Sequence, residues 1–263
     1  MIKHNANNGG GDYAKLVWSD EFNGSQLDLS KWKMDVNCLG GGNNEQQCYV
    51  DNTDTEVISV KDGKLRIQPQ YRENEWKMAS SARLNSLGPN GGAWHRGKFV
   101  IKAKMPKGNF VWPSVWMLPK VSKYGGWPSD GEIDIIEAKG QNENVVNHNL
   151  HHGGPWRVEH VQYVPVQSSA DMFHEYVLVW TDNKMEWSVD GVITHTMGLN
   201  DTWVHGQNTN IYSAPGQPWT EPFYLIVNVA VGGDFFGGAK MNPEYDAPTW
   251  TSPLEIDYIR VYQ

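Results

Sequence analysis

The sequence contains very little cysteine: Cys38 and Cys48 are the only two among 263 residues, and they form no CxxC pair. This excludes a structural zinc finger, which needs four closely spaced Cys or His ligands. A disulfide between the two would close a short loop, stabilise the fold by ~2–3 kcal/mol and fit an oxidising compartment. The alternative is two reduced thiols that lie near each other by chance.

Long hydrophobic runs are missing as well. The longest apolar runs, such as Phe223 to Val227, have five residues, which is far too short to span a membrane. Residues 1–12 are polar and rich in Gly and Asn. They offer no apolar stretch for a signal peptide, and we expect them to be disordered or loosely ordered. We expect a secreted, extracellular protein whose signal peptide has been removed, with a cytoplasmic protein as the alternative.

Positive charge is in the minority, and the formal net charge is −8. This argues against a nucleic-acid or other polyanionic partner, because such binding depends on the release of condensed counterions. We therefore expect no nucleic-acid partner. We also expect a monomer and no membrane partner.

Helical periodicity is also lacking, and we expect short helical turns only near Leu29 to Trp32 and Ser168 to Phe173. Short runs that alternate or are apolar throughout are present instead, separated by Gly, Pro and Asp-Gly turns such as Asp190-Gly191. This pattern predicts one all-β domain, a sandwich or barrel, over residues 13–263. The clearest predicted strands are Lys64 to Gln68, Gly97 to Lys104, His174 to Thr181, Met185 to Val189, Phe223 to Val231 and Leu254 to Tyr262.

Aromatic residues are abundant, with 13 Trp and 11 Tyr. We expect about half of the tryptophans to fill the core. The others are available as flat platforms for the apolar faces of sugar rings.

Three carboxylates, Glu132, Asp134 and Glu137, cluster in an otherwise apolar, β-prone segment. In a regular strand alternate side chains share a face, so Glu137 would point away from the other two. A β-bulge at Ile135 or Ile136 supplies one extra residue and returns Glu137 to their face. Glu132 and Glu137 then come within the roughly 5–5.5 Å that retaining glycoside hydrolysis requires. Repulsion within the cluster keeps one acid protonated while another ionises.

Other interpretations exist for this segment and for the nearby histidines. An exposed acidic strand face usually interleaves Lys or Thr, and calcium ligands more often lie in loops with Asp/Asn/Gly spacing. A metal site could also involve His148, His151 and His152, but these residues lack the HExxH spacing of a zinc hydrolase.

The motif EIDIIE at 132–137, preceded by WPSD at 127–130, resembles the signature of glycoside hydrolase family 16. The extra residue in E-x-D-x-x-E is the form found in the family's laminarinases, agarases and carrageenases, whereas its lichenases and xyloglucan-modifying enzymes lack it. Residues 13 to 262 resemble the laminarinase-like branch, although only some of its members have the cysteine pair. The matching blocks are LVWSDEF (16–22), GGGNNEQQCY (40–49), SARL (81–84), PKGNFVWPSVWMLP (106–119), NVAVGG (228–233) and IDYIRVY (256–262).

The resemblance implies a β-jelly-roll sandwich of two curved antiparallel sheets with the substrate cleft on the concave face. It implies that Glu132 is the nucleophile, that Asp134 tunes and orients it, and that Glu137 is the general acid/base. Trp112 and Trp116 would stack sugars on the non-reducing side of the cut, with core packing as the alternative. The full set of implied substrate-binding residues is Asn43, Arg83, Trp112, Trp116, Trp127 and His151, and for Arg83 the alternative is an ion pair with a structural carboxylate.

The resemblance also implies a structural Ca²⁺ site on the convex face, formed by Glu21, the carbonyl of Gly63 and Asp257. Oxygen donors from separate segments suit this hard cation. Catalysis itself would need no cofactor. The stretch 232–243 carries Phe235 and Phe236, and we expect it to shape one end of the cleft.

The sequence therefore predicts an endo-acting, retaining hydrolase of laminarin-type β-1,3-glucan that works by double displacement. Mixed-linkage β-1,3-1,4-glucan is a second candidate substrate. One alternative is a hydrolase of agarose or carrageenan, although sulfated galactans would call for a basic cleft. The other is a non-catalytic β-glucan recognition protein, which would have lost catalytic carboxylates.

Overall fold

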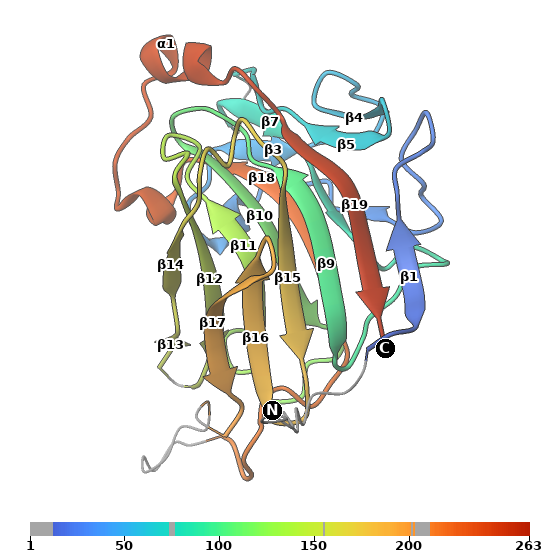
Figure 1. Ribbon diagram of the computed structural model, residues 1–263. Coiled ribbons are helices and arrows are strands. Elements are labelled where there is room, and N and C mark those ends of the chain that lie inside the picture. The colour runs from blue at the N-terminus through green and yellow to red at the C-terminus, as the bar shows by residue number, and fades with distance from the viewer. Residues whose placement is uncertain (1–12, 74–76, 155, 201, 203–210) are drawn as a thin grey trace, which may run out of the picture.

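The computed structural model of the chain describes residues 13–73, 77–154, 156–200, 202 and 211–263 (Figure 1). This part folds into two large antiparallel sheets and a small third sheet. The predicted all-β sandwich is confirmed. The expected loosely ordered segment at 1–12 lies outside the described residues. None of the helices in the described part is both long and apolar enough to cross a membrane.

One large sheet carries the candidate site, and we call it the cleft sheet. Its strand order is β13-β12-β11-β10-β18-β8-β2, and β14 also pairs with β12. The strands are β2 (Lys33–Met34), β8 (Arg83–Asn85), β10 (Val111–Pro119), β11 (Glu132–Ala138), β12 (Val145–His152), β13 (Val158–Glu159), β14 (Gln162–Pro165) and β18 (Phe223–Val231).

The other large sheet, which we call the second sheet, faces the viewer in Figure 1, with the cleft sheet behind it. Its order is β17-β16-β15-β9-β19-β5-β4, and β1 pairs with β19. The strands are β1 (Leu16–Asp20), β4 (Ile58–Lys61), β5 (Lys64–Ile67), β9 (Gly97–Lys104), β15 (His174–Trp180), β16 (Lys184–Val189), β17 (Val192–Gly198) and β19 (Leu254–Tyr262).

The core lies between these sheets and follows the strand period of two. In β9, Phe99, Ile101 and Ala103 are fully buried, whereas the lysines at 98, 102 and 104 are only partly covered. Burying one large apolar side chain contributes about 1.5–3 kcal/mol, so the alternating pattern fixes which face of each strand turns inward. Five tryptophans of the described residues are also buried: Trp32, Trp94, Trp180, Trp187 and Trp219.

The predicted hairpin at Asp190-Gly191 is confirmed, because it joins β16 to β17. Asp190 has φ 49° and Gly191 has φ 79°. Two consecutive positive φ values are the requirement of a type I′ turn, which favours Asp-Gly.

Each of the two expected helical turns is present as a single hydrogen-bonded turn, because the amide of Trp32 donates to the Asp28 carbonyl and the amide of Met172 donates to the Ser168 carbonyl. The expectation that helical turns occur only there is wrong. The short helices of the described residues are η1 (Gly40–Gly42), η2 (Asp234–Phe236), α1 (Pro243–Asp246) and η3 (Ala247–Thr249). Local chemistry explains α1: the side chain of Asn242 accepts a hydrogen bond from the Glu244 amide, and Pro243 occupies the first turn, where its missing N–H costs nothing.

Cys38 and Cys48 are joined in a disulfide. Cys48 lies in β3 (Gln47–Tyr49), which pairs with β7 (Ala79–Ser81) in the third sheet, and β6 (Gln70–Tyr71) completes that sheet. The disulfide therefore closes the Gly-rich loop at 38–48, and several residues of this loop line the cleft described next.

Candidate active site

The three carboxylates lie on β11, and the strand contains the expected bulge. Against β10, Glu137 pairs with Ser114 and Asp134 pairs with Trp116, with a register shift in between. Against β12 the register shifts between Asp134 and Glu137 as well. The extra residue lets Glu137 face the same side as Glu132 and Asp134, while Ile133, Ile135 and Ile136 are fully buried.

Glu137 is held from both sides by neutral donors. The indole Nε1 of Trp112 donates to Oε1 of Glu137 at 2.9 Å. The amide Nδ2 of Asn147, its direct partner on β12, donates to Oε2 at 2.8 Å. These contacts fix the carboxyl group in one orientation without placing a cation in hydrogen-bond contact with it.

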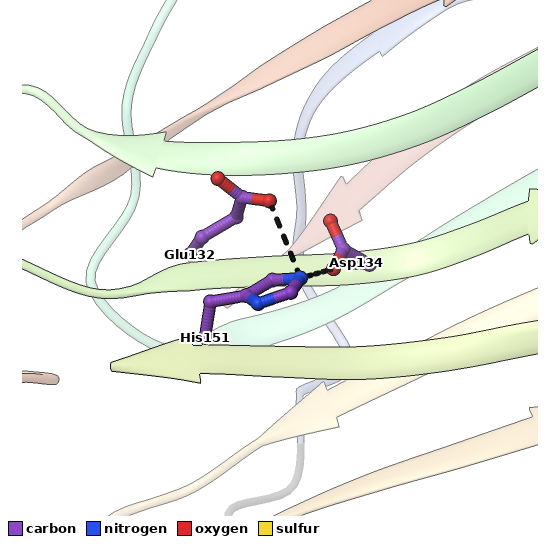
Figure 2. A group of neighbouring side chains, drawn as sticks. All are labelled: Glu132, Asp134 and His151. Carbon is purple, nitrogen blue, oxygen red and sulfur yellow. Dashed lines mark ion pairs between the residues drawn. The ribbon is translucent and has the colours of Figure 1, made fainter. Parts of the chain in front are cut away.

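Glu132 and Asp134 meet His151 from the neighbouring strand β12, as Figure 2 shows. Nε2 of His151 lies 3.7 Å from Oε1 of Glu132 and 3.3 Å from Oδ2 of Asp134. Glu132 also accepts a hydrogen bond from Nε1 of Trp127 at 2.7 Å. Among the described residues, Oδ2 of Asp134, Oδ1 of Asn149 and Nδ1 of His151 are buried without a hydrogen-bond partner.

The pKa values of the three carboxyl groups are raised to about 8, chiefly by burial. The charge of Asp134 adds to the increase in the pKa of Glu132 and of Glu137, and the charge of Glu159 adds to that of Asp134. A hydrogen bond between Glu132 and Asp134 works in the opposite direction on the pKa of Asp134. Because each ionised group disfavours ionisation of the next, the cluster loses its protons one at a time. It can therefore hold a carboxylate and a carboxylic acid at the same pH.

The carboxylates lie in a cleft of about 680 Å³ on the outer face of the cleft sheet. Every residue predicted for catalysis or substrate binding lines this cleft: Asn43, Arg83, Trp112, Trp116, Trp127, Glu132, Asp134, Glu137 and His151. The structure thus brings together side chains from six separate parts of the sequence.

Residues 43–250 match the family model described as glycosyl hydrolases family 16. The chain belongs to glycosyl hydrolase family 16. A glucan endo-1,3-beta-glucosidase of Cryptopygus antarcticus is 38% identical over 256 residues, which are 93% of this chain and 90% of that protein. The laminarinase of Rhodothermus marinus superposes with a TM-score of 0.82 at 34% identity, over 95% of this chain and 97% of the other. The structure of SCLam, a non-specific endo-beta-1,3(4)-glucanase, gives a TM-score of 0.80 at 31% identity, over 95% and 91% of the two chains.

Membership in family 16 confirms the predicted enzyme class, a laminarinase-like glycoside hydrolase, and the jelly-roll form of the sandwich. The individual contacts add detail that the family resemblance did not supply. The ring of Phe235 stacks on Trp112 with centroids 4.2 Å apart and planes 11° apart, so at most one face of Trp112 remains for a sugar. Lys139 lies over the same phenylalanine at 4.7 Å.

Arg83 makes the ion pair that was the alternative for it, and it also lines the cleft. Its Nε donates to Oδ2 of Asp35 at 3.1 Å. Its guanidinium also lies 4.8 Å from the ring centroid of Trp116. Arg83 therefore lines the cleft as a group already oriented by a carboxylate and an indole.

Several functional contacts were missed by the sequence reasoning. Nε1 of Trp116 donates to Oδ1 of Asn228 at 2.7 Å, and Nδ2 of Asn228 donates to the hydroxyl of Tyr49 at 3.1 Å. That hydroxyl in turn lies 3.2 Å from Oε2 of Glu45, which it reaches as a donor. An indole can only donate, so each group in this chain fixes the orientation of the next. The signal was present in the blocks at 40–49 and 228–233, but the partners are far apart in sequence.

The bulge is supported from the core side by His148. Its Nδ1 lies 2.6 Å from the carbonyl oxygen of Ile135, and its Nε2 lies 2.9 Å from Oγ1 of Thr194. A carbonyl can only accept, so Nδ1 carries the proton. Burial lowers the pKa of His148 to about 4, which keeps the ring neutral at pH 7.

The three neighbouring histidines do not share a metal site, since His148 points into the core and Nε2 of His152 contacts Nε2 of His160 at 3.0 Å. Within the described ranges, one group of three His or acidic side chains has ligand atoms within 4.8 Å of one another, namely Glu132, Asp134 and His151. These three residues line the cleft.

The segments predicted for calcium are brought together by β19. Strand β1, which ends just before Glu21, pairs with β19, and so does β5, which begins just after Gly63. Asp257 lies in β19 at a register shift that leaves it without a partner on β9. The carboxylate of Glu21, however, accepts hydrogen bonds from Arg260 at 2.9 and 2.7 Å. A cation would have to compete with this guanidinium, and the calcium site stays a prediction.

Proposed function

We propose that this family 16 protein is an endo-acting, retaining hydrolase of β-1,3-glucan. In this proposal Glu132 is the nucleophile, Glu137 is the general acid/base, and Asp134 shares a proton with Glu132. The single observation that carries the proposal is the bulge in β11, because it places Glu137 on the face of Glu132.

In the first step, the carboxylate of Glu132 attacks the anomeric carbon of the glucosyl unit. At the same time the carboxylic acid of Glu137 gives its proton to the departing glycosidic oxygen. Burial, which raises the pKa of Glu137 to about 8, keeps that proton available at neutral pH. Trp112 and Asn147 hold the acid in place for the transfer.

In the second step, the Glu137 carboxylate takes a proton from water, whose oxygen attacks the anomeric carbon and displaces Glu132. The two inversions give net retention of configuration. Asp134 stays protonated through both steps, so that the released Glu132 carboxylate has no adjacent negative charge. Burial, which raises the pKa of Asp134 to about 8, supports this role.

The substrate is inferred from the relatives together with the cleft. Relatives named as an endo-1,3-beta-glucosidase and a laminarinase favour β-1,3-glucan. The relative named as a non-specific endo-beta-1,3(4)-glucanase supports mixed-linkage glucan as a second substrate. A role in glucan recognition without catalysis is disfavoured because all three acids are present. A sulfated galactan substrate is disfavoured because acidic residues outnumber basic residues in the cleft lining.

Further parts of the prediction remain proposals. The disulfide supports a secreted protein, because such bonds persist in oxidising compartments. The convergence of Glu21, Gly63 and Asp257 near β19 supports a structural Ca²⁺, which would tie the two ends of the domain together. We also retain the proposal of a monomer.

The direct test is the release of reducing sugar from laminarin, lichenan, carboxymethyl cellulose and agarose. We expect strong release from laminarin, and the amount from lichenan measures how strict the linkage preference is. Glu132→Ala and Glu137→Ala are assayed in parallel, and both should abolish release. A folded wild-type protein that degrades none of these polymers contradicts the proposal.

A further inference from the structure

A row of paired side chains crosses the cleft sheet at the level of Glu137. On one side Glu137 pairs with Ser114 of β10, which pairs with Asn228 of β18. On the other side it pairs with Asn147 of β12, which pairs with Tyr163 of β14. Directly opposed residues in antiparallel strands project from the same face of a sheet. Tyr163 therefore projects from the cleft face, and it belongs to the cleft lining.

Tyr163 is unusually exposed for a large aromatic residue in a strand, with 62% of its surface accessible. It lies on β14, at the margin of the cleft sheet. Two strand spacings separate β14 from β11, which is about 10 Å. The ring is thus beside the reacting groups without being part of them.

Three more residues of the cleft lining extend this surface: Trp127, Arg157 and Val161. We call these three residues together with Tyr163 the β14 platform. The guanidinium of Arg157 lies 5.7 Å from the ring centroid of Trp127. Trp127 is 54% exposed and Val161 is 41% exposed. Flat apolar rings beside a polar hydrogen-bonding group are suited to a sugar, whose ring has an apolar face and a polar edge.

The β14 platform lies opposite the residues proposed to bind the non-reducing side. Trp116 and Arg83 lie on β10 and β8, whereas β14 is beyond β12, on the other side of β11. All of them line one continuous cleft. A chain that passes the carboxylates from the β8 side must therefore leave over the β14 side.

We propose that the β14 platform binds the glucosyl units on the reducing side of the cleaved bond, with Tyr163 as its outer stacking residue. This proposal rests on the proposed glucanase function. Binding of the leaving group away from the reacting bond favours cleavage within a chain over cleavage at its end.

The test compares two substrates. Laminarihexaose can place sugars on the β14 platform, whereas an aryl β-laminaribioside places only its aromatic leaving group there. For Tyr163→Ala, we expect the ratio of kcat/KM for the hexasaccharide to kcat/KM for the aryl glycoside to fall about tenfold. With reducing-end-labelled hexasaccharide, the preferred cut should move toward the reducing end, because fewer units are held beyond it.

Two variants serve as controls. Tyr163→Phe keeps the ring and should keep the ratio within about twofold of wild type. Tyr245→Ala removes a tyrosine that is 70% exposed on α1, outside the cleft lining, and should leave both the ratio and the cutting position unchanged. An unchanged ratio in Tyr163→Ala, or an equal fall in Tyr245→Ala, overturns the proposal.

A binding measurement separates this proposal from the proposed function. In the Glu132→Gln background, calorimetry with laminarihexaose should show about tenfold weaker binding when Tyr163→Ala is added. Equal affinities would contradict the platform even if turnover were observed. A wild type that binds the hexasaccharide through Tyr163 but cleaves no glucan would instead contradict the catalytic proposal alone.

Discussion

Glu255 on the second sheet and Glu137 on the cleft sheet are both buried glutamates in long strands, yet their surroundings are opposite. Glu255 contacts Arg66 at 2.8 Å and Lys104 at 2.5 Å. Burial by itself would raise the pKa of Glu255, but these two cations lower it below 4.5 overall. Glu137 has neutral donors in place of cations, and burial raises its pKa to about 8.

The comparison shows that the partners of a buried acid decide its role. The cations on the second sheet make Glu255 a stabilising carboxylate at neutral pH. The cleft sheet leaves three acids without such partners and thereby keeps a transferable proton. Burying these acids without cationic partners lowers the stability of the folded protein, which is a common feature of active sites.

The largest expected effect comes from removing each of the two glutamates in turn. Glu137→Ala should lower kcat/KM on laminarin at least about 10³-fold, because the leaving group loses its acid. Glu255→Ala should leave activity within about threefold but lower the free energy of unfolding at pH 7 by about 2 kcal/mol, since Arg66 and Lys104 lose their carboxylate and are themselves partly exposed. Urea unfolding and laminarin hydrolysis measure the two effects. A loss of stability in Glu137→Ala that matched that in Glu255→Ala would break the comparison.

A smaller effect is expected on how the free energy of unfolding depends on pH. Here the removal of an acid raises the stability, whereas in Glu255→Ala it lowers it. The pKa of Glu132 rises from 4.5 to about 8 on folding. Between these pH values the folded protein keeps a proton that the unfolded chain loses, so this group lowers stability as pH rises. Glu132→Gln cannot ionise and should be more stable than wild type by about 2 kcal/mol at pH 8, with the difference vanishing near pH 4.

Glu255→Ala provides the matched control for that measurement, because the pKa of Glu255 is lowered on folding. Its contribution is present above about pH 4.5 and is lost as pH falls through the folded pKa. The deficit of Glu255→Ala should therefore shrink on acidification. Parallel pH profiles for the two variants would contradict the opposed roles.

The smallest expected effect comes from loosening the bulge without changing a charge in the cleft. His148→Phe keeps a ring in the core but removes the donor to the Ile135 carbonyl. We expect kcat to fall about fivefold, the equivalent of about 1 kcal/mol, with KM nearly unchanged, because Glu137 is less well positioned while the sugar contacts remain. His148→Asn can restore a donor and should recover part of the lost kcat. An increase in KM with unchanged kcat would show that His148 supports binding instead.

Much of the fold and of the catalytic centre could be predicted from local pattern. Strands such as β9 and β18 follow from their apolar runs and flanking turns, and the hairpin at Asp190-Gly191 follows from its turn residues. The bulge follows from the spacing of Glu132, Asp134 and Glu137, because only an extra residue puts all three on one face.

The remainder depends on contacts between distant segments. The stacking of Phe235 on Trp112 and the link from Trp116 through Asn228 to Tyr49 are set by strand register, which one strand does not encode. The short helices were missed because a single capped turn such as α1 leaves no helical period to detect.

The central claim, that the bulge makes Glu132 the nucleophile and Glu137 the acid/base on one face of β11, is tested most directly by azide rescue. Each alanine variant is incubated with an activated aryl β-laminaribioside and azide, and the product is identified by NMR. In Glu132→Ala, azide should replace the nucleophile and give the α-glycosyl azide. In Glu137→Ala, azide should attack the glycosyl-enzyme and give the β-glycosyl azide. The reverse assignment of products, or rescue of neither variant in a folded state, would contradict the account.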